Sequence, residues 1–336
     1  MTAAVVDLLA SRRWRRAIAG FVTVLSPLVA ASCTADWVQT DIPYEPPARV
    51  NGDQVFGYEK GPIDAQVSLT ESEREYDLLR VSYPSAFQDD LTNRRSAAWY
   101  YRQKNGATSP SIIVLPILGG DYGPSTLFAE FLARRGFNVL RFERKAGLFE
   151  DPNEDIGHAR LIIIRSVIDI RRGLDWWLTQ PEVDAGRLGI CGISMGGIQG
   201  SLVMAVEPRI KAGAFLLNGG HLSEILMRTE EPEVVVYRDA VMKKYNWSPD
   251  EALAEARKQL DDIDPVVFAP NLDPTKVLLI SPRFDKIVPY DLSTAWWDAA
   301  GRPSRITIPT GHYSAVFALH YVEAQTVDHF RRVFGE

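Results

Sequence analysis

The stretch that decides the fold is Arg187-Leu-Gly-Ile-Cys-Gly-Ile-Ser-Met-Gly-Gly197. Its apolar first half predicts a buried strand, and the run that follows it has a helical pattern. Glycines on both sides of Ser194 allow backbone segments to pass close together. We therefore expect a sharp strand-to-helix turn that exposes one hydroxyl group. The amide of Met195 then lies at a helix N-terminus, where positive potential favours an oxyanion.

Short β-rich runs alternate with amphipathic helical runs on both sides of this stretch. Several of the β-rich runs are continuously apolar, which is typical of parallel strands buried on both faces. We predict strands at residues 76–83, 96–102, 111–116, 137–142, 187–193, 210–217, 276–281 and 304–308. Helices are predicted at 125–135 and 160–179. This order predicts the α/β class, with a mostly parallel eight-stranded sheet and helices on both faces.

Residues 219–272 interrupt the alternation between the sixth and seventh predicted strands. They contain Ser248-Pro-Asp-Glu251, a capping-box pattern with proline at the first helical position. The pattern predicts a small helical insertion. Ligands of open α/β sheets bind beyond the carboxyl ends of the strands, so the insertion is interpreted as a lid over a site. The alternative is an ornament packed to one side.

A serine hydroxyl is a poor nucleophile unless a base removes its proton. The chain has five histidines: His158, His221, His312, His320 and His329. The last two fall within the C-terminal helical run, which favours a structural or exposed position, and His221 is a second candidate for a pocket residue. His312 follows the last predicted strand in Pro309-Thr-Gly-His-Tyr313. We predict that His312 is the base.

The base needs an acid that holds its tautomer. Asp285 follows the seventh predicted strand, in Phe284-Asp-Lys-Ile-Val-Pro289. The order Ser194, Asp285, His312 is the chain order of the nucleophile-elbow pattern, with each residue on a loop at the same sheet edge. Asp291 is the nearest rival, although its place after Pro289 favours a helix cap.

A second donor for an oxyanion is expected from the loop after the third predicted strand. This loop reads Leu115-Pro-Ile-Leu-Gly-Gly-Asp-Tyr-Gly123. Pro116 has no N–H group, so the donor is Leu118 or Ile117. We favour Leu118, because the glycines that follow it allow a close approach.

From about Tyr76 to its end, the chain resembles the α/β-hydrolase superfamily, near its dienelactone-hydrolase, acetyl-xylan-esterase and prolyl-oligopeptidase-like branches. Three segments carry the resemblance: residues 174–197, Phe284-Asp-Lys-Ile-Val-Pro289 and Thr310-Gly-His-Tyr-Ser314. Pro116 departs from it, since many members have the histidine of a His-Gly oxyanion motif there. The chain is also too short for the β-propeller of the large peptidases.

The resemblance implies the α/β-hydrolase fold, and the three candidate residues imply a serine hydrolase. We expect two-step acyl transfer on a small-molecule carboxylic ester, with no cofactor and no metal. An acyltransferase or a peptidase with the same triad is the alternative within enzymes. A catalytically silent lipoprotein that uses the fold for binding is the alternative outside them.

The N-terminus has the pattern of an export signal. Four arginines precede an uncharged apolar run, which ends in Val29-Ala-Ala-Ser-Cys33. This ending resembles a bacterial lipobox. It predicts a signal peptide at residues 1–32, lipid attachment at Cys33 and anchoring to the outer side of a bacterial membrane. Cleavage without lipid, giving a secreted protein, and an uncleaved anchor are the alternatives.

Composition limits the remaining possibilities. Residues 33–61 are rich in proline and predict a tether or an extended arm, followed by the hydrolase domain at 62–336.

The formal net charge of the 336-residue chain is −6. We therefore do not expect nucleic-acid binding, because it needs a concentrated cationic surface. Cys191 lies in an apolar run and predicts a core position.

Overall fold

A computed structural model describes most of the chain. The described residues are 33–36, 48–87, 94–119, 123–144, 148–149, 151 and 153–336. The predicted signal peptide at residues 1–32 lies outside them. None of the helices in the described part of the chain combines the length and the apolar character that a membrane crossing requires.

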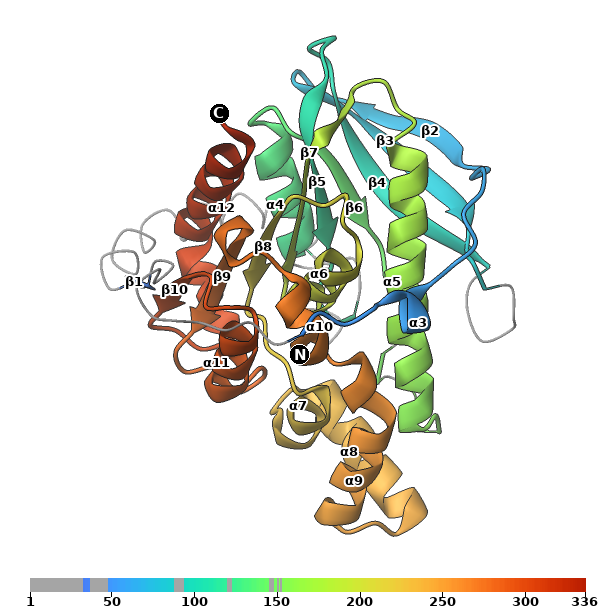
Figure 1. Cartoon of the computed structure of the whole chain (residues 1–336), viewed down its shortest axis with the longest axis vertical. Helices are drawn as coiled ribbons and strands as arrows, with labels where there is room; N and C mark the ends of the chain where they lie inside the picture. The colour runs from blue at the N-terminus through green and yellow to red at the C-terminus, as the bar shows by residue number, and fades with distance from the viewer. Residues whose placement is uncertain are drawn as a thin grey trace.

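The described residues form one twisted sheet of ten strands in the order β1-β10-β9-β8-β7-β5-β6-β4-β3-β2 (Figure 1). The strands are β1 (Thr34–Asp36), β2 (Gln66–Ser72), β3 (Tyr76–Pro84), β4 (Arg95–Gln103), β5 (Ser109–Leu115), β6 (Asn138–Phe142), β7 (Val183–Ile193), β8 (Ala212–Leu216), β9 (Val277–Pro282) and β10 (Ser304–Ile308). Strands β5 to β10 pair in parallel with one another, and β1 to β4 pair antiparallel.

All eight predicted strands are present, but the predicted count of eight is wrong for the described sheet. The two additional strands, β1 and β2, lie at its edges. Every residue of β2 is exposed, including Val67 and Leu69, so β2 has no buried face that would produce a recognisable pattern. Strand β1 has only three residues and pairs antiparallel with β10, with Ala35 opposite Ile306.

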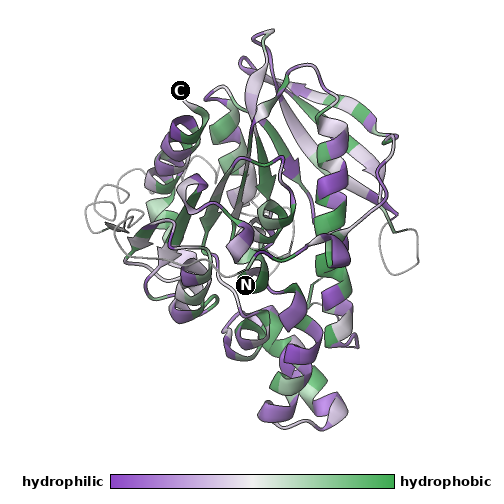
Figure 2. Ribbon diagram, in the orientation of Figure 1, coloured by the Kyte–Doolittle hydropathy of each residue, from purple (hydrophilic) through white to green (hydrophobic). Residues whose placement is uncertain are grey.

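Helices cover both faces of the sheet, as predicted. One face is covered by α4 (Gly123–Ala133) and α12 (Leu319–Phe334). The other is covered by α5 (Ile156–Trp177), α6 (Met195–Val206) and α11 (Tyr290–Ala299). Figure 2 shows hydrophobic residues concentrated on the central strands and on the helix surfaces that face them. Trp296 is fully buried, as expected, and packs edge-on against Phe215 of β8.

The segment before β2 also contacts the domain. It contains α3 (Asp53–Phe56), whose Phe56 is fully buried and packs against Phe268. The backbone N–H of Val50 donates a hydrogen bond to the side chain of Asn271 (2.9 Å). These contacts hold the described part of the segment against the last helical residues of the stretch 219–272.

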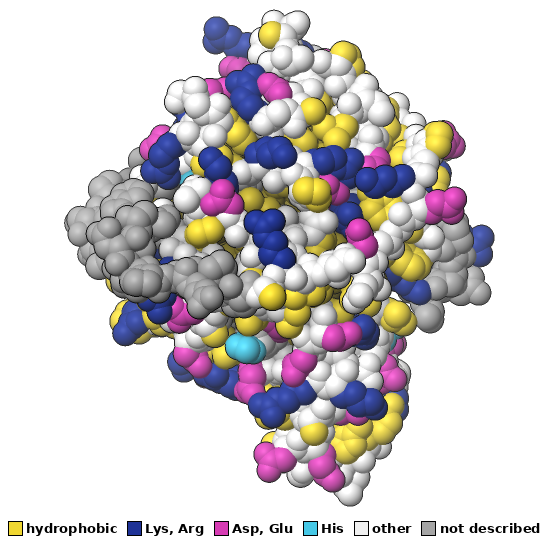
Figure 3. Space-filling model, viewed as in Figure 1, with side chains coloured by type: hydrophobic (Ala, Val, Ile, Leu, Met, Phe, Trp, Pro, Cys, Tyr) yellow, Lys and Arg dark blue, Asp and Glu magenta, His cyan; other side chains and the backbone are white. Residues whose placement is uncertain are grey.

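Residues 219–272 are mostly helical; their first three helices project from one end of the molecule, and the last packs against α6 (Figure 1). They contain α7 (Leu222–Arg228), α8 (Pro232–Tyr245), α9 (Pro249–Leu260) and α10 (Pro265–Phe268). The capping box predicted at the start of α9 is present, with Ser248 and Glu251 bonded reciprocally. Figure 3 shows acidic and basic side chains interspersed over these helices, as expected for a surface in water. We call α7, α8 and α9 the lid helices.

Candidate active site

Ser194 lies at the turn between β7 and α6, with φ 57° and ψ −123°. A positive φ is unusual for a residue with a side chain and costs backbone strain, which the surrounding structure must hold. The N–H of Ser194 donates to Leu216 O (2.8 Å), and its carbonyl accepts from Ile198 N (3.0 Å). The predicted sharp strand-to-helix turn is therefore present.

Two glycines make this turn possible. A Cβ atom on Gly192 would lie 2.1 Å from Gly196 O, and a Cβ atom on Gly196 would lie 2.5 Å from Leu115 O. Both distances are far below van der Waals contact, so no side chain fits at either position. The absence of side chains lets α6 begin directly against the end of β5.

The structure brings Ser194, His312 and Asp285 together in one chain of hydrogen bonds. His312 Nδ1 lies 2.7 Å from Asp285 Oδ2, and His312 Nε2 lies 2.9 Å from Ser194 Oγ. An ionised carboxylate only accepts hydrogen bonds, so Nδ1 carries the proton and Nε2 is left to accept from the serine hydroxyl. The Asp285 side chain is 1% exposed and that of His312 9% exposed, so water competes little for these bonds.

Backbone amides hold the carboxylate of Asp285 in place. Its Oδ1 accepts from the N–H groups of Ile287 (2.8 Å) and Val288 (2.9 Å), which leaves Oδ2 to face His312. The rival Asp291 is held elsewhere. It forms a two-pronged ion pair with Arg228 of α7 (2.8 and 2.9 Å), which lowers the pKa of the Asp291 carboxyl.

A small cavity of about 60 Å³ opens beside Ser194. Met195 and Leu118, the two predicted oxyanion donors, both line it. Ile117, the alternative donor, is not among the lining residues. Ser194 and the two predicted donor residues therefore line one cavity.

The lid helices form the opposite wall of this cavity. Leu222 and Leu226 of α7, Val234 of α8 and Leu260 of α9 line it. The insertion therefore lies over the candidate site. Besides Ser194, the polar lining residues are Thr229 and Glu231. Neither was predicted from the sequence, because they belong to a segment without a recognisable chemical motif.

The other four histidines lie outside the triad. His221 is exposed and does not line the cavity. His158 pairs with Glu154, which lies just before α5, and His320 pairs with Glu323 on α12. His329 is almost fully buried, bonds to Lys276 O (3.2 Å), and has a pKa lowered to about 4 by its burial. A histidine in that position is neutral and structural, as its helical location predicted.

The two cysteines lie in different surroundings. Cys191 is buried in the sheet, as predicted. Cys33 stands immediately before β1, and partial burial raises the pKa of its thiol. The described residues contain no group of His, Cys, Asp and Glu side chains that is suitable for a metal ion.

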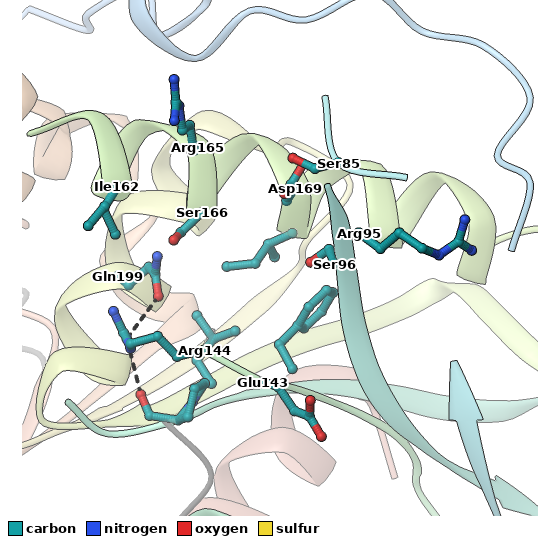
Figure 4. Close-up of a pocket in the computed structure, with 14 residues that line it drawn as sticks. Ser85, Arg95, Ser96, Glu143, Arg144, Ile162, Arg165, Ser166, Asp169 and Gln199 are labelled. Atoms are coloured by element: carbon teal, nitrogen blue, oxygen red, sulfur yellow. Dashed lines mark hydrogen bonds between the residues drawn. The ribbon is translucent and has the colours of Figure 1, made fainter. Parts of the chain in front are cut away.

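A second pocket has several polar lining residues, among them Arg144, Gln199 and Asp169 (Figure 4). Arg144, which follows β6, donates to Gln199 Oε1 of α6 (3.2 Å) and to Pro116 O (3.4 Å). Gln199 lies on the same helix as Met195, and Pro116 opens the loop that carries Leu118. Arg144 therefore connects the two segments that supply the candidate oxyanion donors.

Comparisons with known proteins agree with this architecture. No family model and no curated sequence matches the chain. Among solved structures, acetyl xylan esterase 1 from Thermoanaerobacterium sp. JW/SL YS485 is similar, with a TM-score of 0.59 and 15% identity over 77% of this chain and 88% of that chain. The acetyl xylan esterase from Paenibacillus sp. R4 has a TM-score of 0.59 and 17% identity over 83% and 96%.

The acylaminoacyl peptidase from Pyrococcus horikoshii is also similar, with a TM-score of 0.57 and 17% identity over 77% of this chain but only 42% of that chain. At such identities the likeness shows the fold alone. The chain has the α/β-hydrolase fold, as its sequence predicted.

Proposed function

We propose that the chain is a serine hydrolase that cleaves small carboxylic esters. Ser194 is the nucleophile, His312 the general base and Asp285 the acid that holds its tautomer. The observation that carries the proposal is the pair of hydrogen bonds from Asp285 through His312 to Ser194, at 2.7 and 2.9 Å. An imidazole between a buried carboxylate and a strained serine turn is the arrangement that acyl transfer requires.

The reaction proceeds in two steps. His312 Nε2 takes the proton of Ser194 while Oγ attacks the ester carbonyl, and the amides of Met195 and Leu118 stabilise the oxyanion. The imidazolium then gives its proton to the departing alcohol, leaving an acyl group on Ser194. Water attacks the acyl-enzyme with His312 again as the base, which releases the carboxylic acid and restores the serine.

Two observations favour a small ester over a peptide. The cavity beside Ser194 is small and mostly apolar, which suits a short acyl group better than a peptide chain. The chain also spans most of the length of two acetyl xylan esterases, but less than half of the acylaminoacyl peptidase. Assays with added alcohol acceptors separate hydrolysis from acyl transfer by the same triad.

The proposal is tested with Ser194→Ala. Hydrolysis of an activated acetyl ester should fall at least about 1,000-fold, because the acyl-enzyme has no oxygen on which to form. The melting temperature should change little, since the backbone turn is kept. Ser201→Ala on the same helix is the matched control and should retain activity. Wild-type turnover by Ser194→Ala would refute the proposal.

We further propose that the protein is exported and anchored by lipid on Cys33. Because Cys33 directly precedes β1, a lipid there would hold this edge strand of the sheet close to the membrane surface. Cys33→Ser should release a soluble protein or stall processing. Mass spectrometry that finds residues 1–32 still attached to the wild-type protein would refute this proposal.

A further inference from the structure

Glu231 has an unusual position for a carboxylate. It directly precedes α8, is half-buried, and lines the same cavity as Ser194. Most of the other lining residues are apolar, and none of them is a lysine, arginine or histidine. A single charged group in an apolar pocket is the kind of polar group that fixes the orientation of a ligand.

The cations nearby on the lid and its facing loop bind other groups. Arg228 pairs with Asp291, and Lys286 pairs with Glu230 (3.1 Å). Arg238 donates to backbone carbonyls at the end of α7, including Met227 O (2.9 Å). In the described part of the chain, the charge of Glu231 is therefore not balanced by an ion pair.

The exposed side chain of Tyr313 holds this carboxylate in place. Its O–H donates to Glu231 Oε2 (2.6 Å), and burial together with this bond raises the pKa of the Tyr313 phenol. The phenol therefore stays neutral and keeps donating. Among the described residues, no group donates to Glu231 Oε1, so one oxygen remains open to a ligand. Tyr313 follows His312 in the chain, which places the carboxylate near the catalytic base.

We propose that Glu231 is a specificity-determining residue that binds a positively charged group on the substrate. The preferred substrate is an ester whose acyl or alcohol part carries an ammonium group. A cation is favoured over a neutral hydroxyl because the pocket presents one negative charge, and the exposed ring of Tyr313 beside it offers a π face that also attracts cations. This inference rests on the proposed ester hydrolysis.

The inference is tested with two esters of nearly the same shape. Acetylcholine carries a quaternary ammonium group, and 3,3-dimethylbutyl acetate is its neutral carbon isostere. The wild-type kcat/KM should be about five- to thirtyfold higher for acetylcholine, the range expected for a partly screened charge pair. The preference should shrink as salt is added. An acetate ester that carries a carboxylate, 4-acetoxybutyrate, should be the poorest of the three.

Glu231→Gln should abolish this preference and leave kcat/KM for the neutral ester within about threefold, since glutamine keeps an acceptor for Tyr313. Glu233→Gln is the matched control, because Glu233 is an exposed acid on the same helix that does not line the cavity. It should keep the preference. Tyr313→Phe should raise KM for acetylcholine several-fold with little change in kcat, because the ring remains and only the orienting hydroxyl is lost.

Two results would overturn the inference while leaving ester hydrolysis intact. One is a wild-type enzyme that cleaves the neutral ester as well as acetylcholine, or that prefers the hydroxylated ester glycerol monoacetate to both. The other is a preference that survives Glu231→Gln or is lost equally in Glu233→Gln. Failure to cleave any of these esters, with Ser194 inert, would instead overturn the proposed function.

Discussion

Ser194 and the lid helices line one cavity, but different kinds of contact hold the Ser194 side and the lid side. On the sheet side, the backbone fixes the positions of the side chains. The turn at Ser194 needs glycines at 192 and 196, where an added Cβ atom would collide with the backbone, and Asp285 is held by two main-chain amides. On the lid side, buried apolar side chains such as Leu226 and Val234 join the main core. Polar side chains at the rim add further bonds, as in those of Arg228 to Asp291 and of Tyr313 to Glu231.

This difference separates two kinds of function. A site fixed by backbone geometry keeps the same arrangement for every substrate, which bond-making chemistry needs. The polar rim contacts of the lid are exposed, so they can change one residue at a time at little cost in stability. We therefore expect changes at the sheet edge to affect all esters alike, and changes in the lid to alter which esters are accepted.

The largest effect is expected for His312→Gln. Glutamine can contact Ser194 but cannot accept and return its proton, so kcat/KM should fall at least about 1,000-fold for short and long esters alike. His320→Gln is the matched control. His320 lies eight residues after His312, in α12, and pairs with Glu323 rather than with Ser194 or Asp285. A loss for one ester and not another would contradict the uniform effect expected of the sheet edge.

A slightly smaller effect is expected for Asp285→Asn. Asparagine has nearly the same shape, but its amide favours the wrong imidazole tautomer. In serine proteases with this triad, the same change costs about four orders of magnitude in turnover, so we expect a loss of about two to four orders here. Turnover of one activated ester near neutral pH measures it.

Asp291→Asn is the control for this variant. Asp291 binds Arg228 and not His312, so its turnover should stay within about threefold of the wild type. If Asp291→Asn lost two or more orders of magnitude in turnover and Asp285→Asn stayed within about tenfold of the wild type, the assignment of the acid would be wrong.

Shortening the lid should change specificity more than rate. We expect a variant in which a short Gly-Ser linker replaces α8 and α9 to accept longer acyl or alcohol groups, because Val234 and Leu260 no longer close the cavity. Rates on a panel of esters of increasing length measure the change, and a melting curve shows that the variant is folded. An unaltered length profile in a folded variant would count against the lid.

The smallest effect is expected for Arg228→Gln. Its partner Asp291 is largely exposed, so the ion pair contributes about 1 kcal/mol or less to stability. We expect kcat/KM to change less than about threefold, and the double variant with Asp291→Asn to resemble either single one. A coupling energy well above 1 kcal/mol between Arg228 and Asp291 in the double-mutant cycle would contradict the small contribution expected of an exposed ion pair.

The two regions also differ in how well the sequence predicted them. The elbow, the eight strands and the positions of Asp285 and His312 follow from local apolar runs and glycines, which fold the same way in any α/β sheet. Strands β1 and β2 were missed because an exposed or very short edge strand has no buried face. The sequence indicated a cap for Asp291, but its ion pair joins two segments that are distant in the chain.

The insertion was predicted as a helical lid over the site, yet the residues that it contributes there were not. Glu231 meets Tyr313 only because the folded chain brings the start of α8 against the loop of His312. No local spacing encodes that contact. Leu118 and Met195 were predicted from backbone arguments, and both line the cavity. Their role as oxyanion donors remains a prediction.

The most direct test of the account is labelling with a fluorophosphonate probe, followed by mass spectrometry of the modified peptide. An activated serine displaces fluoride and keeps the phosphonyl group on its oxygen. The account predicts one adduct, on Ser194, and no labelling of Ser194→Ala. An adduct on another serine, or undiminished labelling of Ser194→Ala, would contradict the central claim.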